Sequence, residues 1–492
     1  MLDEAQVRRE KLQRARALGL NPYPAASERS ASCGEALKHF ESWIETIHPI
    51  TLAGRILTIR VHGGMMFADL QDAEGKLQIA FKEDALGEEA FARFRDLIDP
   101  GDIVEASGTL FLTKRGEKTL NVTSWNLLSK ALLPLPEKWH GLQDTEIRFR
   151  KRYLDLIMNP EVRARLETRS KLISELRTFL DARGFLEVET PTLQPVYGGG
   201  FARPFKTHHN ALEADFYLRI SDEMYLKRLI VGGFERVYEI TKVFRNEGID
   251  RDHNPEFTMF EAQIAYQDYR FGMDLFEEIF EHLAVTVLKN TEVPHEGQTL
   301  RLSRPWRRMR LVEALEEVAH LRPLDWKTVE EARAAVQPHL QSTKVESLNQ
   351  LQTIGEITAF AFEECVEGTL IQPTLIYDYP VEVSPLAKRC DDPRFTQRFE
   401  AFALGSEIGN NYSELNDPID LEQRFIEEKK KEQAGFDEAH QTDEDYLDAI
   451  RHGMPPVCGL GIGVDRMVMV FTGASNIKEV IAFPTLRPES EV

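Results

Sequence analysis

Apolar and polar residues alternate along five short segments in the first third of the chain, as they do in strands with one buried face. The segments cover residues 52–61, 66–70, 76–81, 103–111 and 119–128. Turn-forming residues separate them, and residues 83–97, between the third and fourth segments, have the spacing of a helix. Five strands with a helix at this place predict an OB-fold β-barrel over residues 50–133, a fold whose exposed strands bind single-stranded nucleic acid.

The rest of the chain alternates long helices with strands, which predicts an α+β fold. Residues 160–183 have a helical apolar face that begins after Asn159, a residue type that caps helices. Residues 237–247 and a segment that starts near residue 256 have the composition of strands, and residues 248–255 form a charged loop between them. Loops of this length usually position a ligand or a catalytic group.

Four regions follow from these patterns. Residues 1–49 contain a basic helix at 7–17 and a lead-in, and residues 134–160 form a charged, proline-containing linker between the barrel and a second domain, residues 161–492. This second domain contains a helical insertion at about residues 296–370. The basic helix is either a solvated charged face or an arm that steers phosphates, and the sequence leaves both open.

The overall charge, the cysteines and the lengths of the apolar runs limit the partners and the cellular compartments that we expect for this protein. The formal net charge is −21, with 81 acidic against 60 basic residues, which excludes a wholly basic nucleic-acid binder but not local basic patches. The four cysteines form no Cys-x-x-Cys pair, so neither a disulfide framework nor a zinc site is expected. The N-terminus lacks the apolar core of a secretory signal, and no apolar run has the length of a membrane span. We therefore expect a cytoplasmic protein that does not contact membranes.

The stretch around the charged loop offers side chains that suit a nucleotide. Arg245 has a planar fork that matches two phosphate oxygens, while Arg251 and His253 add cationic groups for a polyphosphate. A purine can stack on Phe257, and Glu247 can accept a hydrogen bond from its exocyclic amine. An arginine–glutamate ion pair beside a buried phenylalanine explains the spacing equally well.

Two further patterns near the C-terminus suit a metal–nucleotide complex. If Gly405-Ser406 forms a two-residue turn between two strands, Glu400 and Glu407 lie on one face, where two carboxylates suit Mg²⁺; a solvated acidic pair is the alternative. Strict alternation places residues 410, 412 and 414 on the opposite face from Glu407 unless a bulge intervenes. The run Gly-Leu-Gly-Ile-Gly at 459–463 leaves one strand face bare, and Asp465 is expected to cap a helix with Arg466 in its first turn.

The sequences of these motifs resemble those of a known protein family. Phe-Arg-Asn-Glu-Gly at 244–248, followed by His-Asn-Pro-Glu-Phe-Thr-Met-Phe-Glu at 253–261, resembles motif 2 of the class II aminoacyl-tRNA synthetases, and the lysyl-tRNA synthetases in particular. Residues 184–191 resemble motif 1, and residues 459–466 resemble motif 3. The resemblance covers nearly the whole chain and implies a homodimer with an antiparallel catalytic sheet flanked by helices and a barrel that reads the anticodon.

The resemblance also implies an activity and a set of roles. The expected reaction joins L-lysine to ATP as an adenylate and transfers the lysyl group to the 3′ end of tRNA(Lys), with Arg245 and Arg466 as catalytic residues. Mapped by position, it assigns ATP to Arg245, Glu247, His253, Asn254, Phe257, Gly461, Gly463 and Arg466, lysine to Gly199, Glu223, Arg245, Glu261, Gln263, Asn410, Tyr412 and Glu414, and Mg²⁺ to Glu400 and Glu407. On the barrel, Arg60, Phe67 and Gln71 are candidates for tRNA contacts, with core packing or plain exposure as the alternative.

Five positions depart from the family's usual residues. The family generally has Tyr at the position of Gln263, Phe at that of Tyr412, Arg at that of Asp252, Ala at that of Gly200 and an acidic residue at that of Ser124. Two other functions stay open at this stage. One is a paralogue that uses the same adenylate chemistry on a lysine analogue or a protein acceptor, and the other is a catalytically silent tRNA-binding protein.

Overall fold

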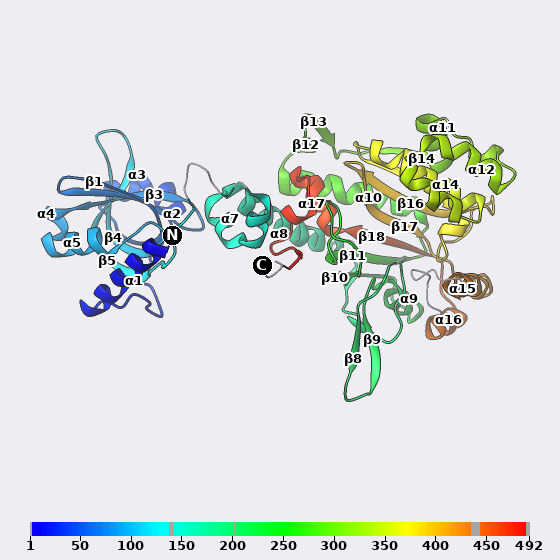
Figure 1. Ribbon diagram of the computed structural model, residues 1–492, viewed down its shortest axis with the longest axis horizontal. Coiled ribbons are helices and arrows are strands. Elements are labelled where there is room, and N and C mark those ends of the chain that lie inside the picture. The colour runs from blue at the N-terminus through cyan, green and yellow to red at the C-terminus, as the bar shows by residue number, and fades with distance from the viewer. Residues whose placement is uncertain (1, 137–141, 143, 201, 434–442, 489–492) are drawn as a thin grey trace. The chain divides into compact units, whose positions relative to one another are not determined.

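A computed structural model describes residues 2–136, 142, 144–200, 202–433 and 443–488, and the chain forms two compact units, Met1–Gln143 and Asp144–Val492 (Figure 1). The first unit is a closed β-barrel and the second is built on an eight-stranded sheet. The predicted fold class is therefore confirmed.

The barrel has the five strands that the alternating pattern predicts. They are β1 (Pro49–His62), β2 (Met65–Gln71), β3 (Lys76–Lys82), β4 (Ile103–Leu112) and β5 (Lys118–Ser129), in the order β1-β2-β3-β5-β4 with β1 and β4 closing the ring. The short helices α4 (Glu83–Leu86) and α5 (Glu88–Leu97) follow β3. Every second residue of β1 between Ile50 and Ile56 is buried, because strand side chains alternate between the interior and the surface.

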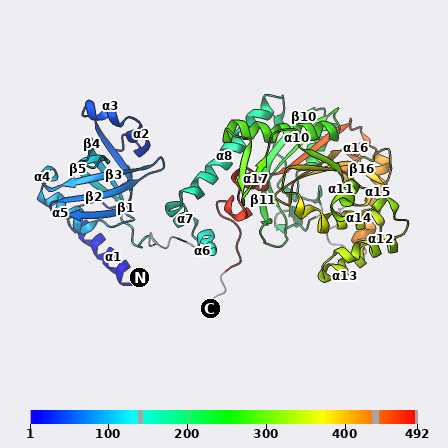
Figure 2. The ribbon, with the colours of Figure 1, turned by 90° about the horizontal axis from the view of Figure 1, so that it is seen from above.

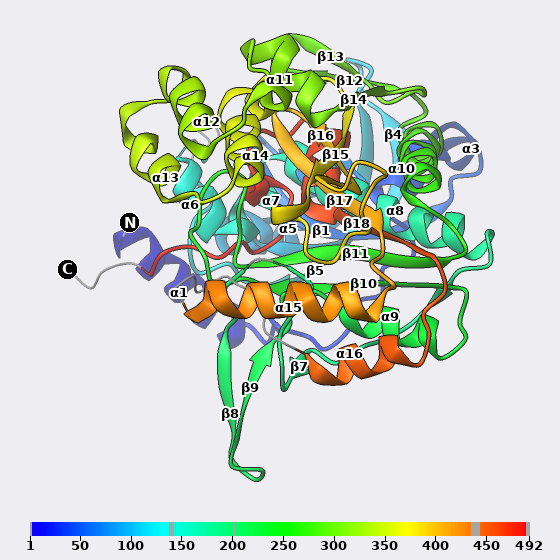
Figure 3. The ribbon, with the colours of Figure 1, turned by 90° about the vertical axis from the view of Figure 1, so that its right-hand side faces the viewer.

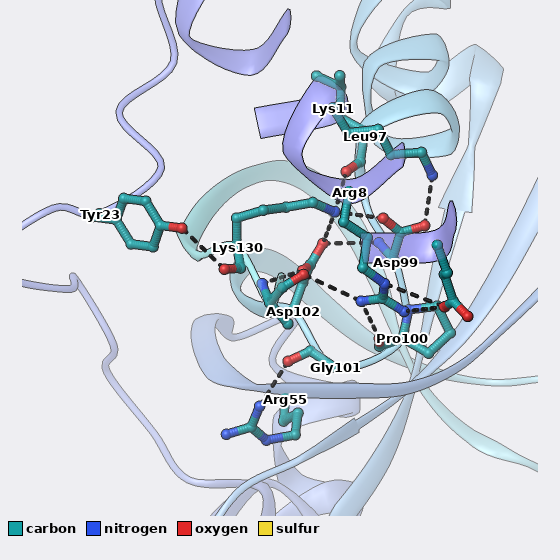
Figure 4. A network of polar contacts seen from close by, with 12 residues as sticks. Arg8, Lys11, Tyr23, Arg55, Leu97, Asp99, Pro100, Gly101, Asp102 and Lys130 are labelled. Carbon is teal, nitrogen blue, oxygen red and sulfur yellow. Dashed lines mark hydrogen bonds and ion pairs between the residues drawn. The ribbon is translucent and has the colours of Figure 1, made fainter. Parts of the chain in front are cut away.

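The helix α1 (Leu2–Ala17) packs on the barrel through part of its basic face (Figure 4). The Arg8 guanidinium donates to the carbonyl oxygens of Pro100 and Ala131, at 3.1 and 3.3 Å, and Lys11 pairs with Asp99 at 2.5 Å. Arg8 and Lys11 therefore fasten the helix to the barrel, a role that neither interpretation of the basic helix describes. The other arginines of the helix, Arg9, Arg14 and Arg16, are exposed.

A buried lysine forms the centre of this network (Figure 4). The Lys130 side chain is completely buried, and its ammonium donates to Asp102 at 2.8 Å, to Asp99 at 2.6 Å and to the carbonyl oxygen of Leu97. Burial raises the pKa of Asp102, and Lys130 opposes that rise. A buried carboxylate without such a partner is costly.

We therefore expect Lys130→Met to destabilise the barrel by about 3–5 kcal/mol, because it leaves Asp102 buried without its cation. Hydrogen exchange of barrel peptides in the full chain measures this as a loss of protection confined to the first unit. Lys114→Met removes an exposed lysine between β4 and β5, and we expect it to leave protection unchanged. Equal losses in the two variants would contradict the prediction.

The main sheet of the second unit has the order β14-β15-β16-β17-β18-β11-β10-β6. Its strands are β6 (Leu186–Glu187), β10 (Arg236–Phe244), β11 (Glu256–Ala265), β14 (Arg307–Arg310), β15 (Thr374–Pro380), β16 (Phe395–Ala403), β17 (Ser406–Ser413) and β18 (Val457–Gly463). Neighbours pair antiparallel except at the two ends, where β6 runs parallel to β10 and β14 parallel to β15.

The two faces of the sheet differ in character. Alternate residues of β11, namely Phe260, Ala262 and Ile264, pack into the largest apolar core of the unit, under α8 (Pro160–Asp181), α10 (Tyr269–Leu283) and α17 (Val464–Thr472) (Figure 2). The intervening residues Glu261 and Gln263 face the other way, into a cavity. Near this second face lie α9 (Glu223–Val231), α15 (Pro418–Gln433) and α16 (Glu444–Arg451), which share a smaller core.

Smaller elements surround the sheet. A three-stranded sheet contains β7 (Leu193–Gln194), β8 (Lys206–His209) and β9 (Ala214–Leu218), and its β8–β9 hairpin projects from the unit (Figure 3). The strands β12 (Glu292–His295) and β13 (Gln298–Arg301) form a separate pair. The helices α11 (Leu311–Ala319), α12 (Val329–Val336), α13 (Val345–Gln350) and α14 (Ile354–Cys365) pack over the β14–β16 end of the sheet.

The structure differs from the expected layout in two regions. Within the stretch 134–160, residues 137–141 and 143 lie outside the described residues, but α6 (Thr145–Arg150) and α7 (Arg152–Met158) belong to the second unit instead of a linker. Buried Arg152 anchors them through Asp155 at 2.8 Å and three backbone carbonyls near the C-terminus. The region 296–370 is not purely helical, because it contains the edge strand β14. The sequence of β14, Arg-Arg-Met-Arg, is mostly charged and so does not show the pattern of a strand.

The two predicted helix caps differ from expectation in different ways. Asn159 occupies the predicted cap position before α8, but its amide donates to Asp155 Oδ1 and makes no capping bond. The helix α17 begins directly after Gly463, so Asp465 lies in its first turn and not at the cap. Its buried carboxylate accepts from the Thr258 backbone N–H and from Arg169, both at 2.6 Å, and thus ties α17 to β11 and α8.

Candidate active site

A cavity of about 340 Å³ opens on the polar face of the sheet, lined by residues of β11, β16, β17 and β18. Its wall contains every residue that the sequence assigned to catalysis, ATP, lysine or metal. These are Gly199, Glu223, Arg245, Glu247, His253, Asn254, Phe257, Glu261, Gln263, Glu400, Glu407, Asn410, Tyr412, Glu414, Gly461, Gly463 and Arg466. Residues more than 250 positions apart in the sequence therefore share one site.

A β-bulge brings the acidic residues of β16 and β17 to this wall. Ala401 pairs with Gly409 but Phe402 pairs with Glu407, so Ile408 is the extra residue. Because the bulge shifts the alternation of side chains along β17, Glu407 and Asn410 both line the cavity. The turn between the strands is not Gly405-Ser406, as expected, but Leu404-Gly405, both of which have positive φ.

Arg245 lies at the centre of the cavity wall. The guanidinium carbon lies 5.1 Å from the centre of the Phe257 ring, and its Nε is buried without a hydrogen-bond partner among the described residues. Burial lowers the pKa of Arg245, whereas Glu247, Glu407 and Glu261 raise it, and the guanidinium remains charged. A desolvated cation with unused donors is suited to bind carboxylate or phosphate oxygens.

A second arginine contacts the loop of motif 2. The guanidinium of Arg466 donates to the Glu407 carbonyl oxygen at 2.6 Å, and its other terminal nitrogen lies 3.2 Å from His253 Nε2. Asp250 contacts the opposite nitrogen of His253 at 2.9 Å. The first turn of α17 is the positive end of the helix dipole, so this corner attracts anions.

A cluster of buried glutamates fills the inner end of the cavity. The carboxylate of Glu261 accepts from Ser221 Oγ at 2.8 Å. Burial and the charge of Glu223 raise the pKa of Glu261 to about 7, although Arg245 opposes the shift. Glu223 accepts a hydrogen bond of 2.5 Å from the Tyr412 hydroxyl. Such a cluster favours a cation.

A glycine leaves the room for this cluster. Gly459 pairs in the sheet with both Gln263 and Tyr412. A Cβ at this position would overlap Glu414 Oε1 and would approach Gln263 Nε2 to 3.0 Å. At Gly459 the bare strand face is therefore covered by the side chains of Glu414 and Gln263, which belong to the pocket formed by the buried glutamates, here called the acidic pocket.

The first comparison with known proteins concerns the family. The sequence profile described as tRNA synthetases class II (D, K and N) matches residues 144–487, and the profile of the OB-fold nucleic acid binding domain matches residues 50–128. The chain belongs to the class II tRNA synthetases. The resemblance of the three motifs is thereby confirmed over the whole second unit.

Three relatives that match this synthetase along nearly their whole length carry the same name. A protein of Roseiflexus castenholzii named lysine–tRNA ligase is 50% identical over 491 residues, 99% of each chain. Proteins of the same name from Thermoanaerobacter pseudethanolicus and Carboxydothermus hydrogenoformans are 49% and 48% identical, over 99% and 98% of this chain and 96% and 97% of their own.

The two candidate metal ligands of the synthetase have different surroundings. Glu400 is held by the Tyr379 hydroxyl at 2.7 Å and by Arg398, while the side chain of Glu407 is 37% exposed. Burial raises the pKa of Glu400, with Glu407 adding to the shift and Arg398 opposing it. Among the described residues no group of three or more His, Cys, Asp or Glu is arranged to hold a metal. Two carboxylates nevertheless fit Mg²⁺, which keeps several waters and binds substrate phosphates.

Several side chains that form the site escaped the sequence analysis. Arg398 and Ser221 position the glutamates described above, and Lys227 contacts Glu223 and Glu414. The spacing of Glu223 and Lys227, four residues apart on one helix, was the available signal for an ion pair. Asn254, in contrast, uses its amide within the protein, donating to Glu256 O at 2.6 Å and accepting from Thr485 N–H.

The candidate tRNA residues share the outer surface of the barrel. Arg60 is exposed and pairs in register with the half-buried Phe67. Its guanidinium contacts Asp69 at 3.2 Å and Gln78 at 3.0 Å, and Gln71 follows on the same strand face. These contacts make a polar surface with one aromatic face. None of the helices described is long and apolar enough to cross a membrane.

We expect Gly459→Ala to raise the KM for lysine about 10–100-fold, because its Cβ forces Glu414 out of the pocket and removes a charged hydrogen bond. Steady-state ATP–pyrophosphate exchange measures this. At Gly463 an added Cβ would meet only Arg466 Cβ among the described atoms, at 3.9 Å, so Gly463→Ala is expected to alter the KM for ATP instead. A rise confined to the KM for ATP in Gly459→Ala would refute the assignment.

Proposed function

We propose that this protein is a lysine–tRNA ligase that activates L-lysine with ATP and transfers the lysyl group to the 3′ end of tRNA(Lys). The observation that carries the proposal is the sharing of one cavity by a desolvated cation, Arg245, and a buried cluster of glutamates. The cation suits the carboxylate and the phosphate that react, and the cluster suits a long-chain ammonium. The names of the full-length relatives support the same activity.

In the first step a lysine carboxylate oxygen attacks the α-phosphorus of ATP, and the bond to pyrophosphate breaks. Arg245 neutralises both groups as they approach, and Arg466 with His253 binds the outer phosphates. Glu247 and Phe257 hold the adenine. A carboxylate is already nucleophilic, so positioning and charge neutralisation suffice, and the proposal needs no protein base.

In the second step a terminal ribose hydroxyl of tRNA attacks the carbonyl carbon of the adenylate, and AMP leaves with the bonding electrons. For lysine, Glu223 and the backbone at Gly199 would bind the α-ammonium, while Glu261 and Glu414 bind the ε-ammonium. Glu400 and Glu407 would hold Mg²⁺, which neutralises phosphate charge when bound. The barrel surface around Arg60 and Phe67 would contact the anticodon.

The assembly and compartment are part of the same proposal. The strand β6 is the end of the main sheet, and Leu186 within it is 47% exposed, which favours a homodimer through motif 1. The four cysteines are free, which suits a reducing cytoplasm.

The decisive test is ATP–pyrophosphate exchange measured with each amino acid in turn. We expect exchange that depends on lysine, followed by charging of tRNA(Lys) with lysine. Exchange with a lysine analogue alone would favour a paralogue, and tRNA binding without exchange would favour a silent binding protein.

A further inference from the structure

Lys227 is the cation inside the acidic cluster. It lies one turn after Glu223 in α9, and its side chain is completely buried. The ammonium contacts the Glu223 carboxylate and lies 2.5 Å from Glu414 Oε2. The aromatic rings of Tyr412 and Tyr446 are centred 5.3 and 5.9 Å from it.

The charges that face Lys227 come from three elements. Glu223 belongs to α9, Tyr412 and Glu414 to β17 and its end, and Tyr446 to α16. Burial lowers the pKa of Lys227, but the two glutamates outweigh it and hold the pKa well above its ordinary value. The ammonium is therefore charged before any substrate arrives.

Other ionisable groups lie next to this set. Glu261 faces Glu223 and Arg245, and Asp222 lies beside Glu261 and Glu239. Burial and these neighbouring charges raise the pKa of Asp222 well above its ordinary value. Near Glu414 lies the Cys458 thiol, and near Tyr446 lies Arg228. Burial raises the pKa of Glu414 to about 8, although Lys227 opposes the rise.

One ammonium that bridges two buried carboxylates fixes their separation. It also lowers the cost of keeping both ionised, since an isolated buried carboxylate takes up a proton instead. We propose that Lys227 is a positioning residue of the lysine site, which clamps Glu223 and Glu414 at a fixed separation so that the substrate meets a preformed acidic pocket. This inference rests on the proposed lysine–tRNA ligase activity.

Without the clamp, protons would occupy the pocket and lysine would have to displace them. Lysine affinity at neutral pH should therefore fall, and the loss should shrink as the pH rises and the carboxylates ionise again. For Lys227→Met we expect the KM for lysine at pH 7 to rise about tenfold or more, and the acidic limb of kcat/KM to move up by about one pH unit. The KM for ATP should stay within about threefold, because Lys227 contacts no ATP-assigned residue among those described.

Two control variants separate positioning from simple damage. Lys227→Arg keeps a cation, and we expect its pH profile to follow that of the unchanged protein. Arg152→Met removes another buried cation of the same unit, whose described partners lie outside the cavity wall. We expect Arg152→Met to lower stability without moving the pH profile.

A measurement on the unchanged protein covers the case in which Lys227→Met does not fold. Titration of lysine in buffers of different ionisation enthalpy gives the number of protons released on binding. With the pKa of Glu261 at about 7 and that of Glu414 held at about 8, we expect release of roughly 1.5 protons per site at pH 7 and of less than about 0.3 at pH 9, after correction for the proton that lysine itself takes up. Release that stays near one proton at pH 9 would overturn the inference, because Lys227 would then not hold down the pKa of Glu414.

The outcomes are distinguishable. Absence of lysine-dependent exchange in the unchanged protein would defeat the proposed function itself. Normal exchange together with an unmoved pH profile in Lys227→Met, or with an equal rise of both KM values, would defeat the role of Lys227 alone.

Discussion

Replacing Arg245 by glutamine is expected to lower the rate of lysine-dependent ATP–pyrophosphate exchange about 10²–10³-fold. Arg245 is the cation whose buried Nε has no described partner, and glutamine cannot neutralise the carboxylate and α-phosphate that must approach each other. Stopped-flow or single-turnover measurement of adenylate formation isolates this step from product release.

The substitution Arg245→Lys tests the geometry of the same group. A lysine keeps the charge but loses the planar fork, so we expect a rate well below that of the unchanged protein. Arg270 is an exposed arginine at the start of α10, outside the cavity wall, and Arg270→Gln should leave the rate unchanged. A fall of less than about tenfold in Arg245→Gln would remove Arg245 from the reaction centre.

The second large effect is expected at Glu261. Glu261→Gln removes a buried carboxylate that would pair with the substrate ε-ammonium, and breaking such a pair costs about 3–5 kcal/mol, so we expect kcat/KM for lysine to fall by about 10²–10³-fold or more. Glu256→Gln is a matched control, because Glu256 begins the same strand but is exposed and lies outside the cavity. Parallel exchange assays over a range of lysine concentrations compare the two variants.

The pH dependence gives a separate test of Glu261. Its pKa is raised to about 7, and its carboxylate binds an ammonium only when ionised. The pKa of Glu414 is also raised, to about 8. For the unchanged protein, kcat/KM for lysine should therefore fall about tenfold per pH unit between pH 8 and 7 and about a hundredfold per unit below pH 7, as both carboxylates take up protons. In Glu261→Gln the slope below pH 7 should return to about tenfold per unit. A slope of about a hundredfold that persists there in that variant would assign the second titration to another group.

The charge of the pocket also separates lysine from the other substrates of the family. The carboxylates of Glu223, Glu261 and Glu414 suit an ammonium and, when ionised, repel the side chain of aspartate. Of the three one-letter codes in the description of the family profile, D, K and N, the acidic pocket therefore favours K, which stands for lysine.

Two departures from the family's usual residues meet at one place. Gln263 and Tyr412 flank Gly459 on neighbouring strands, and the Tyr412 hydroxyl holds Glu223 at 2.5 Å. The phenol that the family generally has at position 263 is thus absent there, while a phenol is present across Gly459 at position 412. The acidic pocket therefore still contains one tyrosine hydroxyl.

Local sequence patterns were sufficient to predict the strands of the barrel and most strands of the main sheet. The five barrel strands match their predicted ranges to within a few residues, because one face of each is buried and alternation reports burial directly. Every residue that the motifs assigned to catalysis, ATP, lysine or metal lies on the cavity wall, which also contains residues that the motifs did not identify, such as Arg398. The pattern missed β14, because Arg307–Arg310 is an edge strand whose side chains are mostly charged.

The sequence by itself determined the fold class, the family motifs and many of the residues on the cavity wall. The tertiary structure decided three things that no local pattern contains: the bulge at Ile408, the bonding of Asp465 to β11 instead of a helix cap, and the insertion of Lys227 between Glu223 and Glu414. Each depends on pairing between segments that are far apart in the chain. A side chain's burial and charge are set by what other segments bring against it, and the order of residues along one segment does not record that.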